Sequence, residues 1–377
     1  MADDTTPPDS IDQSKEKKKS RRPANTAFRQ QRLKAWQPIL TPKTVIPLFF
    51  AIGVICAPIG GLLLWASTTV KYLSIDYTNC FRDAPEDAPG PLDSSLIKHH
   101  FDNASIPATW QRFEDISHTY GNFTVTGLRR CVLNFTLPVE LDAPVLFYYS
   151  LENFYQNHRR YVQSFYDRQL AGDDVSIQQV KDSSCEPLEV DDEGRAYYPC
   201  GLIANSLFND TYSSLVLLNV PGEVKVNETY EMSEKGIAWS SDKELYKQTK
   251  TTDYDKIVPP KYWQDRFPDG RYTDEYPPPN IGEDEHFMVW MRTAGLPDFS
   301  KLYARNDTHP MVAGTYSLEI IDSKFQVIFL TFYATPMSNR IPPQTSERTF
   351  TLARRKYCSL SCLLWAATTI SSASFGL

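Results

Sequence analysis

The sequence predicts a mainly β ectodomain, an antiparallel β-sandwich with long irregular arms and a few helices, carried on a transmembrane α-helix. Three observations predict this class. One uncharged apolar run near the N-terminus is long enough to cross a bilayer. Alternating or β-branched stretches recur in the rest of the chain. Between them lie connectors rich in proline, which cannot take part in regular strand pairing.

Residues 1–44 form a basic N-terminal segment that we expect in the cytosol. The first 24 residues are polar, charged and proline-bearing, and should be disordered. Residues 25–42, NTAFRQQRLKAWQPILTP, mix aromatic with basic side chains. They predict either an amphipathic helix on the membrane surface or a docking segment for a partner, with Phe28, Arg29, Arg32 and Trp36 as candidates. No groove-binding helix or base-stacking sheet follows, so we expect no nucleic-acid partner.

Residues 45–69 are predicted to span a membrane. Their apolar run, VIPLFFAIGVICAPIGGLLLWA, carries no charge and exceeds the length of about 20 residues that a bilayer core requires. A cleaved signal peptide would start nearer the N-terminus and be shorter. Ten Lys and Arg residues lie between positions 11 and 43, against only Lys71 and Arg82 in the twenty residues after the span. The positive-inside rule therefore predicts a cytosolic N-terminus and a lumenal or extracellular remainder.

Glycosylation sequons support the same topology. All six lie after the predicted span, at Asn103, Asn122, Asn134, Asn209, Asn227 and Asn306. A single sequon is weak evidence because the pattern arises often by chance. Six on one side of the span and none on the other indicate that this side faces the lumen.

The cysteines give a second indication of an oxidising compartment. Cys80, Cys131, Cys185 and Cys200 follow the span, and an even number is typical of disulfide-bonded lumenal domains. Four cysteines allow three pairings. We expect Cys80 with Cys131 and Cys185 with Cys200, because this pairing closes two separate loops. Cys56 lies inside the span and is expected to be inert packing.

Residues 70–335 are predicted to form the ectodomain. Its strand-like stretches are residues 123–128, 131–137, 213–220 and 314–332. Residues 258–285, VPPKYWQDRFPDGRYTDEYPPPNIGEDE, are an irregular connector because proline interrupts them repeatedly. The clearest helix candidate is residues 151–172, LENFYQNHRRYVQSFYDRQLAG, where apolar side chains recur near helical spacing.

No catalytic constellation is recognisable. The phosphate-binding GxxxxGK[ST], the dinucleotide GxGxxG, the GxSxG elbow and the zinc-binding HExxH are all missing from the sequence. The adjacent His99 and His100 have no third ligand at a suitable spacing and are expected to be solvated. Paired loop carboxylates such as Asp191 and Asp192 would serve a glycosidase only at the right separation. We therefore expect no enzymatic activity, no metal and no cofactor.

Several long segments resemble one known family, the ligand-effect modulator 3 or cell division control protein 50 family. They are NTAFRQQRLKAWQPILTP, IDYTNC, YYSLENFYQNHRRYV, YPCGLIANSLFNDT, GIAWSSDKELY and HFMVWMRTAGLPDFSKLY, and together they cover roughly residues 25–322. Members are accessory β-subunits of type IV P-type ATPases, the phospholipid flippases. The four lumenal cysteines fall where a fungal-type member would place two bridges, and Asn209 matches a glycosylated position.

The resemblance implies a two-span protein whose lumenal domain caps the outer loops of the ATPase. Such a subunit forms a heterodimer with the ATPase, contacts membrane lipids, supports exit from the endoplasmic reticulum and assists the catalytic cycle. The ATPase binds ATP and phospholipid. The complex is expected in the endoplasmic reticulum, Golgi, endosome or plasma membrane. The alternative from another class is a stand-alone lumenal receptor or sugar-binding glycoprotein.

Within these motifs, aromatic and polar residues have different expected roles. Phe154, Tyr155, Trp239 and Trp290 are most simply core residues. A run of four polar residues inside an aromatic helix needs hydrogen-bonding partners, so these residues are either buried polar struts or partner contacts. They are Asn157, His158, Arg159 and Arg160.

Residues 336–377 depart from the family pattern. A member should continue after YSLEIIDSKFQV into a second spanning helix, but the apolar stretch at residues 357–370 is too short for the about 20 residues required. We favour an error in the gene model near residue 325, either an intron that was read through or a shift of the reading frame. The alternative is a chain with one span and a lumenal tail. A transcript read across this region distinguishes the two. As written, the chain would be a poor flippase partner.

Overall fold

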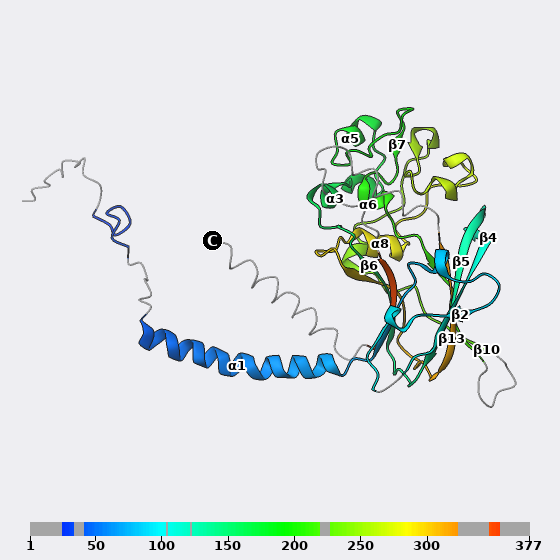
Figure 1. Ribbon diagram of the computed structural model, residues 1–377. Coiled ribbons are helices and arrows are strands. Elements are labelled where there is room, and N and C mark those ends of the chain that lie inside the picture. Colours follow the sequence, from blue (N-terminus) through cyan, green and yellow to red (C-terminus); the bar gives the residue numbers. More distant parts are fainter. Residues whose placement is uncertain are drawn as a thin grey trace, which may run out of the picture. The chain divides into compact units, whose positions relative to one another are not determined.

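The structure is a computed structural model that describes residues 25–33, 41–102, 105–120, 123–218, 227–322 and 347–354. The chain divides into two compact units, Met1–Leu62 and Leu63–Leu377. The first holds most of one long helix, and the second holds the sheets and the short helices (Figure 1).

Helix α1 (Pro42–Thr68) is the predicted spanning segment. Its stretch Val45–Thr68 is 24 residues long with a mean hydropathy of 2.3, and none of it is buried against protein. Among the described residues this is the one helix long and apolar enough to cross a membrane. Pro47 and Pro58 lie inside it, as membrane helices tolerate. Cys56 is exposed on this helix and is a free thiol.

The first sheet has five antiparallel strands in the order β12, β6, β14, β1, β3. Their bounds are β1 Tyr72–Asp76, β3 Ile97–His99, β6 Val145–Glu152, β12 Phe299–Asn306 and β14 Glu347–Arg354. Burial alternates along β1, where Leu73 and Ile75 point inward. This is the period of two that a half-buried strand requires.

The second sheet follows the order β10, β9, β13, β5, β4, β2, with β8 also paired to β13. Its strands are β2 Gly90–Pro91, β4 Ala108–Tyr120, β5 Phe123–Leu137, β8 Thr211–Tyr212, β9 Leu215–Leu218, β10 Asn227–Tyr230 and β13 Gly314–Asp322. The predicted strands at 123–128 and 131–137 are one continuous strand, β5. Of residues 213–220 and 314–332, residues 215–218 and 314–322 are strands, and 219–220 and 323–332 lie outside the described residues.

One continuous apolar core joins the two sheets, so the predicted mainly β architecture is confirmed. Phe147 of β6 meets Tyr212 of β8 edge to face, with ring centroids 5.0 Å apart. A disulfide joins Cys80, in the short helix α2 (Cys80–Asp83) after β1, to Cys131 on β5. The second disulfide joins Cys185 to Cys200. These are the two pairs expected from the sequence.

Strand β14 lies inside the segment 336–377, which we had placed outside the ectodomain. It pairs with β6 on one side and with β1 on the other, so it is the middle strand of the first sheet. Its sequence ERTFTLAR alternates threonines with Phe350 and Leu352, which suits a strand. The rest of the segment, including Cys358 and Cys362, lies outside the described residues.

The predicted helix at 151–172 is wrong. Leu151 and Glu152 end strand β6, and Asn153 then turns the chain with a φ of 59°. Only Arg159–Gln163 (α3) and Asp167–Leu170 (α4) are helical. Between them Ser164 is fully buried, and its hydroxyl donates to the carbonyl of Cys185 and accepts from the N–H of Leu202. These tertiary bonds override the helical periodicity.

Residues 153–210 and 231–298, here called the irregular region, contain only short elements. They are α3, α4, α5 (Ile177–Lys181), α6 (Leu202–Asn205), α7 (Ser240–Lys243), α8 (Glu285–Met291), β7 (Ala196–Tyr197) and β11 (Ile257–Val258), and the 3-10 turns Tyr254–Lys256, Gln264–Arg266 and Pro268–Gly270. A further 3-10 turn, Ser94–Leu96, precedes β3. Strands β7 and β11 pair in parallel as a separate two-stranded sheet.

Candidate partner-binding surface

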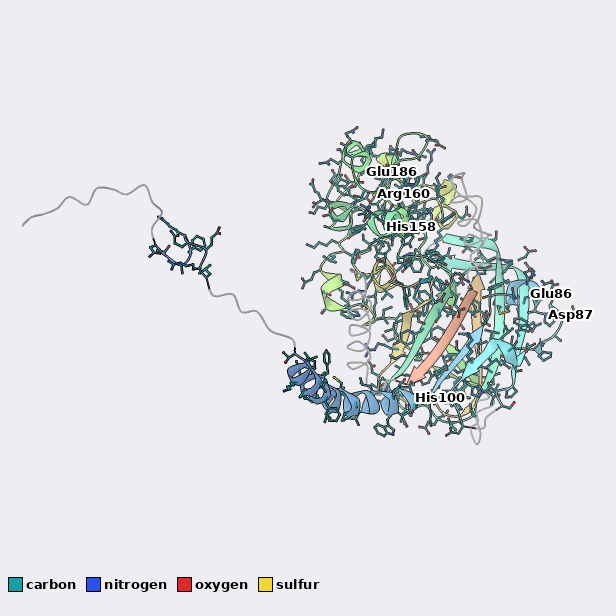
Figure 2. The ribbon with its side chains drawn as sticks, turned by 60° about the vertical axis from the view of Figure 1, so that its left-hand side comes forward. Glu86, Asp87, His100, His158, Arg160 and Glu186 are labelled. Atoms are coloured by element: carbon teal, nitrogen blue, oxygen red, sulfur yellow. A yellow bond between two sulfur atoms is a disulfide. The ribbon has the colours of Figure 1, made fainter. Side chains whose placement is uncertain are left out.

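The polar run predicted as struts or contacts lies on the surface. Asn157, His158, Arg159 and Arg160 are all exposed, and His158 and Arg160 project from the same end of the second unit (Figure 2). They are therefore not buried struts. Gln156 fills that role instead, because it is fully buried and its Oε1 accepts from the N–H of Ala294 at 2.8 Å.

The four aromatic residues predicted as core divide into two groups. Trp290 is fully buried, with its Nε1 donating to the carbonyl of Ile203 at 2.8 Å, and Phe154 is half-buried against it. Tyr155 and Trp239 are 47% and 58% exposed. The core prediction is correct for Trp290 and wrong for Tyr155 and Trp239.

The exposed aromatics belong to a larger set of uncovered side chains, which we call the docking surface. It consists of Tyr155, Trp239, Leu245, Arg292 and Leu296, of which Leu245 and Leu296 are 59% and 55% exposed. Two bonds join the segment that carries Tyr155 to the segment that carries Leu296. The N–H of Phe154 donates to the carbonyl of Pro297 at 3.0 Å, and the amide of Asn157 donates to the carbonyl of Gly295 at 3.0 Å.

Arg292 fixes Trp239 on this surface. The guanidinium carbon lies 4.1 Å from the centre of the Trp239 ring, a cation–π contact. The same guanidinium makes two bonds to the Asp242 carboxylate, 2.7 and 3.0 Å long. Because Asp242 fixes Arg292 and Arg292 holds the exposed indole, less side-chain entropy is lost when a partner covers Trp239.

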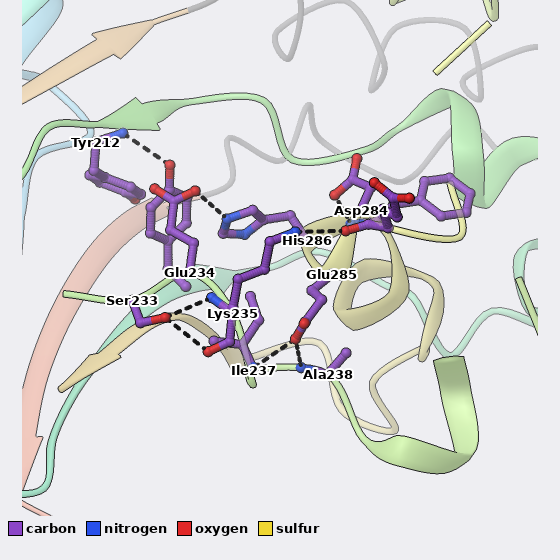
Figure 3. Close-up of polar contacts among 12 residues, drawn as sticks. Tyr212, Ser233, Glu234, Lys235, Ile237, Ala238, Asp284, Glu285 and His286 are labelled. Carbon is purple, nitrogen blue, oxygen red and sulfur yellow. Dashed lines mark hydrogen bonds and ion pairs between the residues drawn. The ribbon is translucent and has the colours of Figure 1, made fainter. Parts of the chain in front are cut away.

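Glu285 ties the loop that carries Trp239 to helix α8 (Figure 3). Its Oε2 accepts from the N–H groups of Ile237 and Ala238 at 2.9 and 3.0 Å, and its Oε1 accepts from Lys243 at 2.7 Å. Burial acts to raise the pKa of Glu285. The bonds from Lys243 and from the loop outweigh burial and lower the pKa to about 2.

Lys301 holds the other end of α8. This buried ammonium donates to the carbonyls of Val289, Trp290 and Arg292 at 2.8, 2.9 and 2.6 Å. Burial, with a smaller contribution from the charge of Arg292, lowers the pKa of Lys301 to about 7. The three carbonyls favour the charged form, because a neutral amine has only two hydrogens for three acceptors. Lys301 thus satisfies carbonyls that the helix end leaves unpaired.

Sequence reasoning quoted the segments that hold Arg292, Glu285 and Lys301 but gave these residues no role. One signal was available for Glu285, an acidic residue two positions before the apolar run FMVWM. A second signal was available for Trp239, which is followed by the polar residues SSDK and so lacks the apolar periodicity of a core helix.

The segment 25–42, predicted to be a docking segment or a membrane-surface helix, is described only in part. Residues 27–31 form a turn, Phe28 is 76% exposed, and Arg29 and Arg32 are exposed. Arg32 donates to the side chain of Asn25. Trp36 lies outside the described residues.

The sequons differ in their surroundings. Asn227 is exposed at the start of β10, while Asn134 on β5 and Asn306 at the end of β12 are half-buried. Asn209 is 8% exposed. Asn103 and Asn122 lie outside the described residues.

The histidines give no sign of a metal centre. Within the described part of the chain, no group of three or more His, Cys, Asp or Glu side chains is arranged to hold an ion. The exposed ring of His100 contacts the carbonyl of Thr68 at 2.9 Å and stacks on Tyr72.

Residues 63–331 match the model of the LEM3 (ligand-effect modulator 3) family / CDC50 family. The chain is also 44% identical over 313 residues to a protein of Chaetomium thermophilum named phospholipid-transporting ATPase accessory subunit CDC50, an alignment that covers 81% of this chain and 76% of the relative.

Relatives in more distant organisms match a similar share. The phospholipid-transporting ATPase accessory subunit LEM3 of Saccharomyces cerevisiae is 39% identical over 80% of this chain and 72% of its own length. The mouse protein named cell cycle control protein 50A is 38% identical over 80% of this chain and 76% of its own length.

Proposed function

This chain belongs to the LEM3/CDC50 family, and we propose that it is the non-catalytic accessory subunit of a phospholipid-transporting P-type ATPase. The observation that carries the proposal is the similarity, over about four fifths of the chain, to proteins named as accessory subunits of such ATPases. The chain forms a heterodimer with the ATPase and supports its folding, its exit from the endoplasmic reticulum and its catalytic cycle. Phospholipid translocation and membrane asymmetry then depend on it indirectly.

The subunit acts by contact and not by chemistry. A protein without reactive groups changes a partner's cycle if it contacts some conformations better than others. The docking surface suits this role because it offers a tryptophan, a tyrosine and an arginine to a partner, and residues of these three types dominate binding energies. The exposed Arg159 and Arg160, which have no ion-pair partner among the described residues, would contact acidic loops of the ATPase.

We place the N-terminus in the cytosol and the ectodomain in the lumen or outside the cell. Three features support this orientation: the excess of Lys and Arg before α1, the sequons after it, and two disulfides that persist only in oxidising compartments. Residues 25–42 then face the cytosolic surface of the ATPase, while α1 contacts the ATPase and membrane lipids.

Purification in mild detergent tests the assignment. The protein, tagged in its own gene so that the natural transcript is translated at native level, should bring down a large P-type ATPase in equal amount. A chain that purifies alone, and whose loss leaves phospholipid asymmetry unchanged, would instead support a stand-alone receptor or sugar-binding protein. Enzymatic deglycosylation tests the orientation separately, because a lumenal ectodomain should lose several glycans, with Asn209 among the occupied sites.

A further inference from the structure

A groove of about 880 Å³ lies between the edge strand β10 and the turn that joins β12 to β13. This volume is within the range of small-molecule sites. Tyr230, Met232 and Val312 give it apolar walls, and Glu231, Arg305 and Thr308 give it polar ones. A mixed lining of this kind suits a sugar, which presents hydroxyl groups at its edges and C–H bonds on its faces.

Two sequons adjoin this groove. Asn306, in the sequon Asn-Asp-Thr, is itself part of the lining, and Thr308 lies beside it. Asn227 begins β10, and the next residue, Glu228, also lines the groove. An N-linked sugar on Asn306 would therefore start inside a cavity of suitable size.

The side chain of Asn306 is held in place without using all of its hydrogens. Its Oδ1 accepts from the N–H groups of Thr308 and His309, both at 3.0 Å, and its Nδ2 donates to the carbonyl of Glu231 at 2.8 Å. Attachment of a sugar joins Nδ2 to the sugar C1, releases one amide proton and breaks the bond from C1 to the pyrophosphate of a lipid-linked donor. The remaining N–H is sufficient for the bond to Glu231.

We propose that this groove seats the first sugars of an N-linked glycan on Asn306. Tyr230 forms one wall and is braced there, because its hydroxyl donates to the carbonyl of His309 at 2.8 Å. The N-acetyl methyl and the apolar sugar faces pack on Tyr230 and Val312, and the hydroxyl groups face Glu231 and Arg305.

A seated glycan would also cover an open sheet edge. Strand β10 pairs only with β9 among the described strands, and Asn227, Glu228 and Thr229 are exposed. Unpaired edges favour association with other chains, and natural proteins cover them. Asn306 is at one end of β12 and Phe299, close in sequence to Leu296, is at the other, so the glycan would lie away from the Leu296 side of the docking surface.

The proposal rests on the lumenal placement in the proposed function but not on the ATPase partner. The full chain, expressed with its ATPase in a eukaryotic host, is treated natively with an endoglycosidase that cleaves between the first two sugars, and each site is followed by glycopeptide mass spectrometry. We expect Asn306 to be occupied and trimmed at least about tenfold more slowly than the other occupied sites, a difference equal to about 1.4 kcal/mol. After denaturation all sites should be trimmed alike.

Substitution of a residue in the groove wall distinguishes binding of the glycan in the groove from its attachment to Asn306. Tyr230→Ala should leave Asn306 occupied but remove its protection, while Val139→Ala, at an exposed residue outside both the groove and the docking surface, should change neither. If Asn306 carries no glycan, or if its glycan is trimmed in the native protein as fast as the glycan on Asn227, the proposed seat is wrong. The lumenal placement is then unaffected. Absence of glycans from every site would overturn the seat together with the lumenal placement.

Discussion

The two sheets and the irregular region are stabilised by different kinds of hydrogen bond. Strands β5 and β13 are antiparallel neighbours in one sheet and pair over nine residues each, from Gly314 with Leu137 to Asp322 with Arg129. The longest helix of the irregular region, α8, has seven residues, and side chains hold both of its ends. A backbone ladder tolerates changes of individual side chains, whereas a region tied by single side chains does not.

The rest of the irregular region follows the same rule. Gln169 is buried, and its amide donates to the carbonyl of Tyr197 while its Oε1 accepts from the N–H of Cys200, at 2.9 and 2.8 Å. Ser164 and Gln156 make comparable bonds from buried positions. We therefore expect substitutions here to loosen this region, and with it the docking surface, while the sheets remain folded.

The disulfides give the largest expected effects and the sharpest contrast. Replacing Cys80 and Cys131 by serine opens a loop of 51 residues, and replacing Cys185 and Cys200 opens one of 15. The loop-entropy relation gives losses of about 4 and about 3 kcal/mol. Chemical denaturation measures the losses, and hydrogen exchange should show the second pair loosening residues 153–210 before the sheets.

Peptide mapping without reduction checks the pairing on which this contrast depends. A peptide that links Cys131 to Cys185 would contradict it. Equal loosening of both regions by the Cys185 and Cys200 substitutions would show that the irregular region does not unfold by itself.

Glu285 gives the next largest effect and a pH dependence. Its pKa falls from 4.5 to about 2 on folding, which corresponds to about 3 kcal/mol. Because the folded pKa is the lower one, this stabilisation is complete above pH 4.5 and is lost as the pH falls toward 2. Glu285→Gln should lower the free energy of unfolding near pH 7 and flatten its acid dependence. Glu283→Gln, at an exposed neighbouring glutamate, should leave both unchanged.

These two predictions differ in how far the sequence anticipated them. The apolar span and the long strand around Cys131 follow from patterns that a short window contains, and the disulfide pairs follow from the number and order of the four cysteines, although Cys80 and Cys131 are 51 positions apart. Glu285 does not, because its partners, Ile237, Ala238 and Lys243, are more than 40 positions away. A sequence window does not show which distant loop a buried carboxylate will meet.

Two other features were not predicted from the sequence, for related reasons. Strand β14 follows a stretch that departs from the family pattern, and its eight residues become a strand through pairing with β6 and β1, both far away in the sequence. Residues 151–172 have apolar spacing compatible with a helix, yet the chain uses their first residues to finish β6. In both cases tertiary pairing decided between local alternatives.

Trp239 should affect binding more than stability. It is more than half exposed, so Trp239→Ala should lower the free energy of unfolding by less than about 1 kcal/mol, the scale of an exposed cation–π contact. As a rigid anchor it should contribute about 2 kcal/mol or more to association with the ATPase. Titration in detergent measures this, with Val139→Ala, an exposed residue outside the docking surface, as the control. Unchanged affinity would remove Trp239 from the interface.

The smallest expected effect on folding comes from the N-terminal segment, which lies in the other compact unit. Phe28 and Arg32 are exposed, so replacing Phe28, Arg32 and Trp36 together with alanine should leave the free energy of unfolding and the glycans of the ectodomain unchanged. If the segment binds the cytosolic side of the ATPase, recovery of the complex or stimulation of ATP hydrolysis should fall in this triple variant. Lys15→Ala with Lys17→Ala, in the basic run further from the span, removes charge without aromatic contacts and serves as the control. If both variants retain full recovery and stimulation, the segment has only its membrane-surface role, and partner binding then belongs to the irregular region and the span.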